Sequence, residues 1–190
     1  MRNNTFNINC IANYFICKGM TQRLQDKEHK GKYGINIQRL LSYIYLSQAW
    51  SLAICKKKLF LEEIHTWGWG PVVPQIYHEF KNTCGDVIDR YSQEYNMIKD
   101  ESVIYTIDER KDQDARTDIL RSIWYSYKNA TIPQLRQIIT APGTPWDLCR
   151  VKRIIDPSSM IEYYEKKVFS TTYTPVKRRN IDDSDYIPNK

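Results

Sequence analysis

Two histidines have neighbours with which they could perform acid–base chemistry. His65 precedes Thr66, and His78 stands directly before Glu79. A neutral imidazole accepts a proton near neutral pH, and a carboxylate beside it can orient the ring. A hydrolase also needs a nucleophile, a metal or paired carboxylates, and the chain has no Gly-x-Ser-x-Gly, His-Glu-x-x-His, Walker or dinucleotide-binding motif. We therefore expect both histidines to be hydrogen-bonded scaffold residues in a protein that is not an enzyme.

Metal binding is the next chemistry that the residue types permit. Five cysteines, an odd number, occur without a Cys-x-x-Cys spacing, and the three histidines show no ligand spacing with them. Cysteines in this pattern are typical of reduced thiols that behave as small buried apolar residues. We expect neither a metal nor another cofactor.

Nucleic-acid binding is an alternative that the charge of the chain supports. The formal net charge is +6, and an acidic stretch runs from Asp86 to Asp118, so the chain is electrically polarised. The lysines that could contact phosphates are Lys27, Lys30, Lys32, Lys56, Lys57 and Lys58. Tyr33, Tyr43 and Tyr45 could stack on bases, although packing inside the protein is the simpler interpretation for the last two. No helix-turn-helix pattern with a basic recognition helix is present.

The most distinctive segment runs from Ile64 to Tyr77 and contains two tryptophans, two glycines and two prolines. Glycines permit tight turns and prolines stop a helix, so the segment predicts a turn that leads into a helix. Trp67 and Trp69 are separated by two positions and would point to one side of an extended chain. This aromatic surface either packs inside the protein or binds a partner. We expect packing for most of it, with one edge exposed.

This segment resembles the signature of the Panacea-domain family of SocA-like, phage-associated proteins. A second stretch supports the resemblance: Ile37 to Tyr43, followed by Gln48-Ala49-Trp50, is similar to the family's Lys/Arg-Leu-Leu-Tyr-Tyr helix, which ends in Gln-Gly/Ala-Trp. Weaker matches lie at 11–15, 123–127 and 145–146, so the resemblance extends over roughly residues 8 to 165. The chain departs from the family at Thr140-Ala141, where many members have Thr-His, and in a charged insert from Arg23 to Lys32.

The resemblance implies an interaction function. It indicates a non-catalytic antitoxin that neutralises a cognate toxin by direct protein binding, or an adaptor that delivers a partner to a cytoplasmic protease. The alternative is a nucleic-acid-binding regulator encoded on a phage or another mobile element. The residues that we expect to bind the protein partner are Trp67, Trp69, Pro71, Tyr77, Gln48 and Trp50.

Hydrophobic periodicity predicts a mainly α, single compact domain. The expected helices are 8–18 (ended by Gly19), 35–54, 74–81, 112–128, one that starts at the capping box of Thr131 and Gln134, and 157–168. Short irregular or β segments are expected at 59–67 and 103–107. The domain is expected to cover residues 1–168, with a flexible tail at 169–190. No apolar run suggests a membrane span or a secretory leader, so we expect a cytoplasmic protein.

Overall fold

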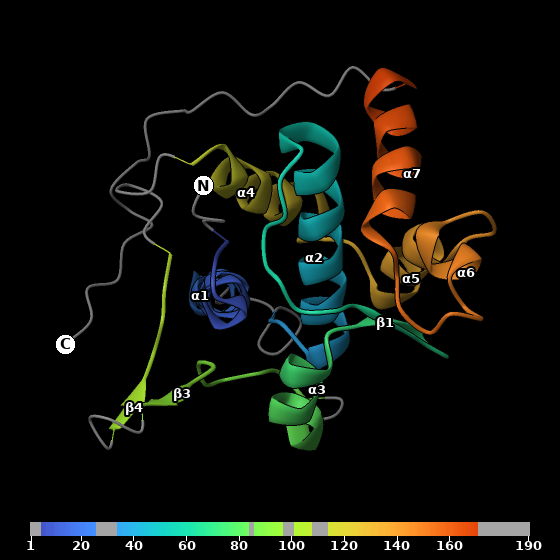
Figure 1. Cartoon of the computed structure of the whole chain (residues 1–190). Coiled ribbons are helices and arrows are strands. Elements are labelled where there is room, and N and C mark those ends of the chain that lie inside the picture. The colour runs from blue at the N-terminus through green and yellow to red at the C-terminus, as the bar shows by residue number, and fades with distance from the viewer. Residues whose placement is uncertain (1–4, 26–33, 84–85, 97–100, 108–113, 171–190) are drawn as a thin grey trace.

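The computed structural model describes residues 5–25, 34–83, 86–96, 101–107 and 114–170, and this part of the chain is compact and mainly α-helical (Figure 1). Its α-helices are α1 (Ile8–Gln25), α2 (Ile37–Trp50), α3 (Pro74–Phe80), α4 (Ala115–Tyr127), α5 (Ile132–Thr140), α6 (Pro145–Leu148) and α7 (Pro157–Ser170). The predicted mainly α fold is confirmed. Most of the predicted tail, and residues 26–32 of the charged insert, lie outside the described residues.

The helix α2 stands at the centre of the structure, and α1, α3, α4, α5 and α7 all contact it. Its apolar residues cover a wide arc rather than one stripe, as expected for a helix with neighbours on several sides. The fully buried side chains of α2 include Leu40, Leu41, Tyr43, Ile44 and Tyr45. The Asn36 side chain caps its start by accepting a hydrogen bond from the N–H of Arg39 (3.0 Å). A π-helical turn, Ser51–Cys55, follows its last residue.

Two buried tyrosines link α2 to α7. The ring centroids of Tyr45 and Tyr164 lie 6.3 Å apart, and neither side chain is more than 2% exposed. Burial, which penalises the charged phenolate, raises the pKa of both groups above the ordinary value of 10. These tyrosines therefore stay neutral in the folded protein at a pH where unfolded tyrosines ionise.

Alkaline pH should therefore destabilise the protein. Above about pH 10 the unfolded chain binds fewer protons than the folded one, so the free energy of unfolding falls as the pH rises; below that pH this contribution is fully present. Urea denaturation at a series of pH values measures the slope. The variant Tyr45→Phe/Tyr164→Phe should flatten the slope, and an unchanged slope would show that these two phenols are not its source.

The prediction that Gly19 ends the first helix is wrong, because α1 continues through it to Gln25. Gly19 is buried, and a Cβ atom at this position would lie 2.9 Å from Cγ1 of Ile35. The glycine therefore lets α1 approach the segment that leads into α2, and its role is close packing rather than termination.

Gly19→Val should lower the free energy of unfolding by about 2 kcal/mol, because the added methyl groups have no room beside Ile35. Chemical denaturation of the variant and the wild type measures the difference. Gly68→Ala is the control at a glycine with room for a side chain, since no heavy atom apart from those of Gly68 and its two chain neighbours lies within 4 Å of the Cβ position there. Equal stability of Gly19→Val and the wild type would contradict the close-packing role.

The Trp-rich segment folds as a β-hairpin. Strand β1 (His65–Trp67) pairs antiparallel with β2 (Gly70–Val72), with His65 opposite Val72 and Trp67 opposite Gly70. Gly68 and Trp69 form the two-residue turn, and Gly70 has a φ of 149°, a value that glycine favours. The prediction of a turn that leads into a helix is confirmed, since α3 begins at Pro74.

A segment distant in sequence lies on the other side of β1. The N–H of Ile155 donates to the carbonyl of Ile64 (2.8 Å), and the N–H of Thr66 donates to the carbonyl of Arg153 (2.9 Å). An isolated bridge joins His65 to Ile154 between these two bonds. The connection between α6 and α7 is thus fixed against the hairpin.

A second hairpin pairs β3 (Glu94–Asn96) with β4 (Glu101–Val103). For residues 103–107 the sequence left open a brief strand or an extended connection; β4 ends at Val103, and residues 104–107 form no regular secondary structure. The carbonyl of Tyr105 instead accepts a hydrogen bond from the side chain of Asn13 (2.8 Å). The alternation in this stretch instead matches its burial, since Val103, Tyr105 and Ile107 are partly buried and the residues between them are exposed.

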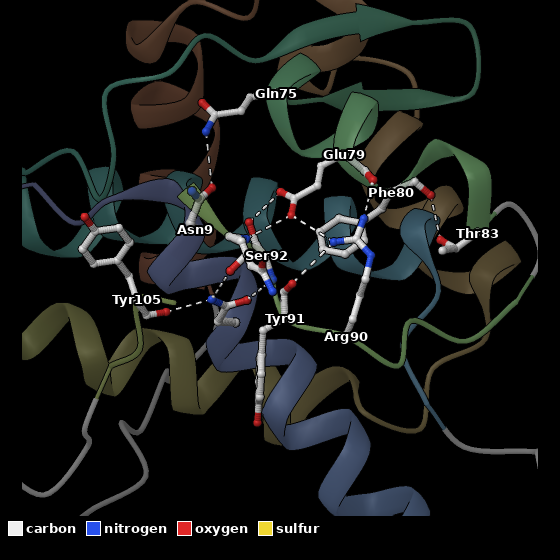
Figure 2. Close-up of polar contacts among 11 residues, drawn as sticks. Asn9, Gln75, Glu79, Phe80, Thr83, Arg90, Tyr91, Ser92 and Tyr105 are labelled. Atoms are coloured by element: carbon white, nitrogen blue, oxygen red, sulfur yellow. Dashed lines mark hydrogen bonds and ion pairs between the residues drawn. The ribbon is translucent and has the colours of Figure 1, made fainter. Parts of the chain in front are cut away.

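A polar network ties α1, α3 and the segment before β3 together (Figure 2). The buried side chain of Asn13 donates to the carbonyl of Ser92 (2.9 Å) and accepts from the N–H of Ser92 (2.6 Å). The hydroxyl of Ser92 donates to Oε2 of Glu79 in α3 (2.6 Å), and the Arg90 guanidinium donates to both the carbonyl and the carboxylate of Glu79. The network holds α3 in a fixed position relative to α1.

Candidate protein-binding site

Four rings from the first hairpin and α3 form one cluster, which we call the aromatic corner: Trp67, Trp69, Tyr77 and His78. The centroid of Trp67 lies 6.2 Å from that of Trp69, 4.7 Å from that of Tyr77 and 6.5 Å from that of His78. The two tryptophans and Tyr77 are half-buried, and His78 is exposed. Part of a large, ordered aromatic surface therefore faces solvent, as predicted for one edge of this segment.

The local sequence determines the shape of the corner. Pro71 and Gly70 form the return strand, and both are buried. Pro74 stands at the first position of α3, where its missing N–H costs no hydrogen bond. The N–H of Tyr77 donates to the carbonyl of Val73 (3.1 Å), so Tyr77 lies one turn into α3, with its ring against Trp67.

The Pro145-Trp146 pair connects the aromatic corner to a distant part of the chain. The indole N–H of Trp146 in α6 donates to the carbonyl of Trp67 (3.1 Å). Trp146 is itself almost fully buried, and the guanidinium of Arg150 lies 5.1 Å from its ring centroid. The sequence shows both motifs, but nothing in their local patterns indicates that residues 79 positions apart would meet.

A notch of about 50 Å³ opens beside Trp69. Residues of α2, the hairpin and α5 line it: Gln38, Ser42, Trp69, Gly70, Pro71, Ile132, Arg136 and Ile139. Ligand pockets in proteins typically measure about 300 to 1,000 Å³, so this notch suits one side chain of a partner rather than a small molecule. Arg136 is exposed and places a positive charge at its rim.

Gln48 lies in the interior and acts on the backbone. Its Oε1 accepts hydrogen bonds from the N–H of Leu59 (2.7 Å) and of Phe60 (3.3 Å), and its Nε2 donates to the carbonyl of Phe60 (3.1 Å). Only 4% of Gln48 is exposed. The side chain therefore fixes the backbone segment that leads into β1, and it offers almost no surface that a partner could contact.

Trp50 lies at the opposite end of α2 from the notch. Ser42, which lines the notch, is eight residues earlier, or about 12 Å along the helix axis. The ring of Trp50 packs against that of Tyr164, with centroids 5.2 Å apart. It also lines a separate hollow of about 270 Å³ with residues of α4 and α7. The structure does not bring Trp50 together with the aromatic corner.

The lysines of the nucleic-acid alternative are only partly described. Lys56, Lys57 and Lys58 are exposed after the π-helical turn, and Lys56 forms an ion pair with Glu165. Lys27, Lys30 and Lys32 lie outside the described residues. Tyr43 and Tyr45 are fully buried, which confirms their packing role and removes them as stacking platforms for bases. Within the described part, the nucleic-acid alternative thus retains one short cluster of lysines.

The two histidines have different surroundings. Nε2 of His65 lies 3.6 Å from a carboxylate oxygen of Glu63, while the ring of His78 packs against Trp67 and Tyr77. The carboxylate of Glu79 is engaged by Ser92, Arg90 and the N–H of Gln93. Among the described residues, no group of three His, Cys, Asp or Glu side chains could hold a metal ion.

Comparison with known families supplies the decisive observation. The family model described as antitoxin SocA-like, Panacea domain, matches residues 40–147, which is more than half of the 190 residues. The chain belongs to this family. The family resemblance seen in the sequence is thereby confirmed. No curated protein and no solved structure matches the chain.

The matched part of the Panacea domain contains all four rings of the aromatic corner and the fastening residue Trp146. It ends before the connection between α6 and α7, and it begins after α1, so it is narrower than the span of roughly 8 to 165 inferred from the motifs. The family assignment indicates a role related to toxin–antitoxin systems. None of the described helices is long and apolar enough to cross a membrane.

Proposed function

We propose that this Panacea domain is a non-catalytic antitoxin that binds a cognate toxin in the cytoplasm through the aromatic corner. The family description supports an antitoxin-related role. The choice of surface rests on the packing of Trp67, Trp69 and Tyr77 against one another while each ring stays partly exposed to solvent. Aromatic side chains that are ordered before binding offer a large contact area and lose little conformational freedom.

The predicted partner-binding residues then divide by their surroundings. Trp69 and Tyr77 contact the toxin directly, and Trp67 supports both rings. Pro71 and Gln48 are buried, and they shape the hairpin and the segment before it. Trp50 packs on Tyr164 away from the corner, so it takes no part in this surface.

An adaptor that delivers its partner to a cytoplasmic protease would use the same surface, but the toxin would be degraded instead of held. A neutralising antitoxin holds the toxin in a stable complex, whereas an adaptor shortens its lifetime. The half-life of the toxin with and without this protein, in cells with and without the protease, separates the two roles. A protease-dependent fall in the toxin's half-life would replace neutralisation by delivery.

Affinity capture from the native cells tests the proposal. The tagged protein is washed at about 50 mM and then about 200 mM salt, because contacts to phosphates weaken steeply over this range. A stoichiometric protein that stays bound is then expressed alone and together with the Panacea domain. Growth arrest that disappears on co-expression supports the antitoxin function; nucleic acid that is lost at the higher salt, with no protein partner, overturns it.

A further inference from the structure

The connection between α6 and α7 exposes an unusual set of side chains. Residues 148–154, which we call the basic loop, carry three aliphatic and three basic residues among seven, with no acidic residue. Leu148 is 65% exposed, Val151 95% and Ile154 37%. The three bases, Arg150, Lys152 and Arg153, are exposed as well. The basic loop lies just outside the part of the chain that matches the family model.

Val151 lies in a loop whose two ends are held in place. Cys149 and Ile155 on either side of it are buried. The N–H of Arg153 donates to the carbonyl of Cys149 (3.1 Å), which closes the turn. The carbonyl of Arg153 accepts from Thr66, so the closed turn is attached to β1. The aliphatic side chains are therefore presented to solvent by hydrogen-bonded backbone.

The basic loop continues the aromatic corner. Arg150 lies over the ring of Trp146, whose indole N–H is bonded to the carbonyl of Trp67. Ile154 is bridged to His65, two residues before Trp67 in β1. The backbone of the loop is thus joined to β1, the strand that carries Trp67, and Arg150 stacks on the tryptophan that is bonded to the same strand.

The charge of the loop is offset only in part within the described residues, where Asp156 interacts electrostatically with Lys152. No carboxylate of the described part forms an ion pair with Arg150, Lys152 or Arg153. The neighbouring carboxylates are engaged with backbone, since Asp147 accepts from the N–H of Gly143 (3.0 Å) and Asp156 from that of Ser158 (3.2 Å). Three like charges on seven residues repel one another, and a negatively charged partner would relieve that repulsion.

We propose that the basic loop is the second half of the docking surface, and that it receives an acidic segment of the protein partner with an apolar side chain against Val151. The inference rests on the proposed function, because it names the chemistry of the toxin surface. Covering exposed aliphatic side chains with apolar groups favours association, and three cations favour carboxylates beside that contact. A phosphate-rich surface such as nucleic acid or an anionic membrane would also meet Asp147 and Asp156, which flank the loop. The carboxylates of a protein segment, in contrast, can be spaced so that they meet the three bases and avoid the two aspartates.

Fluorescence anisotropy with a defined probe tests the inference without the toxin. The probe is a short labelled peptide in which Glu or Asp alternates with Leu or Phe, and the comparison peptide has Lys at every acidic position. Lys152→Glu/Arg153→Glu reverses the loop charge, and Val151→Ser removes its apolar tip. Lys57→Glu/Lys58→Glu is the matched control, because it makes the same change in net charge at another exposed pair. Circular dichroism verifies that each variant is folded.

The acidic peptide should bind the wild type about tenfold more tightly than the lysine peptide. Lys152→Glu/Arg153→Glu should weaken its binding about tenfold, Val151→Ser should weaken it as well, and the control pair should leave it within about twofold. Equal effects of the loop pair and the control pair would overturn the inference. Tighter loop-dependent binding to a DNA duplex, or to vesicles of phosphatidylserine and phosphatidylcholine, would also overturn it. Growth rescue does not use these probes, so the proposed function and this inference can fail separately.

Discussion

Trp69→Ala and Tyr77→Ala should each weaken binding of the toxin by about 2 kcal/mol or more, a rise of about thirtyfold in Kd. Trp69 stands at the turn of the hairpin and lines the notch, so it offers both a flat face and one wall of a recess. The ring of Tyr77 packs at 4.7 Å and 6.0 Å from those of Trp67 and Trp69, which keeps it ordered before binding. Isothermal titration calorimetry with the toxin that passes the growth-rescue test measures the effect.

Two variants separate binding from folding in this experiment. Trp50→Ala removes another half-buried tryptophan, at the far end of α2, and should leave the Kd within about twofold if the corner is the surface. Tyr77→Phe keeps the ring and should retain most of the affinity. If Trp69→Ala and Tyr77→Ala fold normally and bind like the wild type, the aromatic corner is not the site.

Local pattern was sufficient for most of the helices. The capping box of Thr131 and Gln134 forms as expected, with the Thr131 hydroxyl accepting from the N–H of Gln134 and the Gln134 side chain accepting from the N–H of Thr131. Hydrophobic periodicity also predicted a helix over 35–54, where α2 and the π-helical turn after it form. These features depend on residues within a few positions of one another, so the sequence displays them directly.

Features that depend on distant contacts could not be predicted in the same way. Gly19 appeared to end a helix because glycine is favoured there, but a close approach of Ile35 gives it another role. Gln48 belongs to a motif on α2, yet its partners are backbone groups of the following loop. The bond from Trp146 to Trp67 spans 79 positions. In each case the physical cause is tertiary packing, which overrides local preference.

Asn13→Leu should lower the free energy of unfolding by about 3 kcal/mol or more. The leucine has a similar size but would leave the N–H and carbonyl of Ser92 and the carbonyl of Tyr105 without the amide that now pairs them. A buried polar group that loses its partner costs about 1 to 3 kcal/mol, and both Asn13 and Ser92 are fully buried. A typical domain is stable by only about 5 to 15 kcal/mol, so this loss is a large fraction of the total.

The effect should extend to the binding surface, because Ser92, which is bonded to Asn13, also donates to Glu79 in the helix that carries Tyr77. Asn9→Leu is the matched control: Asn9 is a buried residue of α1 one turn earlier, and its side chain accepts a single long bond from Gln75 (3.3 Å). Urea denaturation compares the two variants, and hydrogen exchange at the Ser92 amide reports the local opening. Asn13→Leu should also weaken toxin binding under conditions where the protein is still folded. An equal fall in the free energy of unfolding for both variants would mean that the hydrogen bonds of Asn13 add nothing to the effect of replacing any buried asparagine. The position of α3 would then depend on its apolar packing alone.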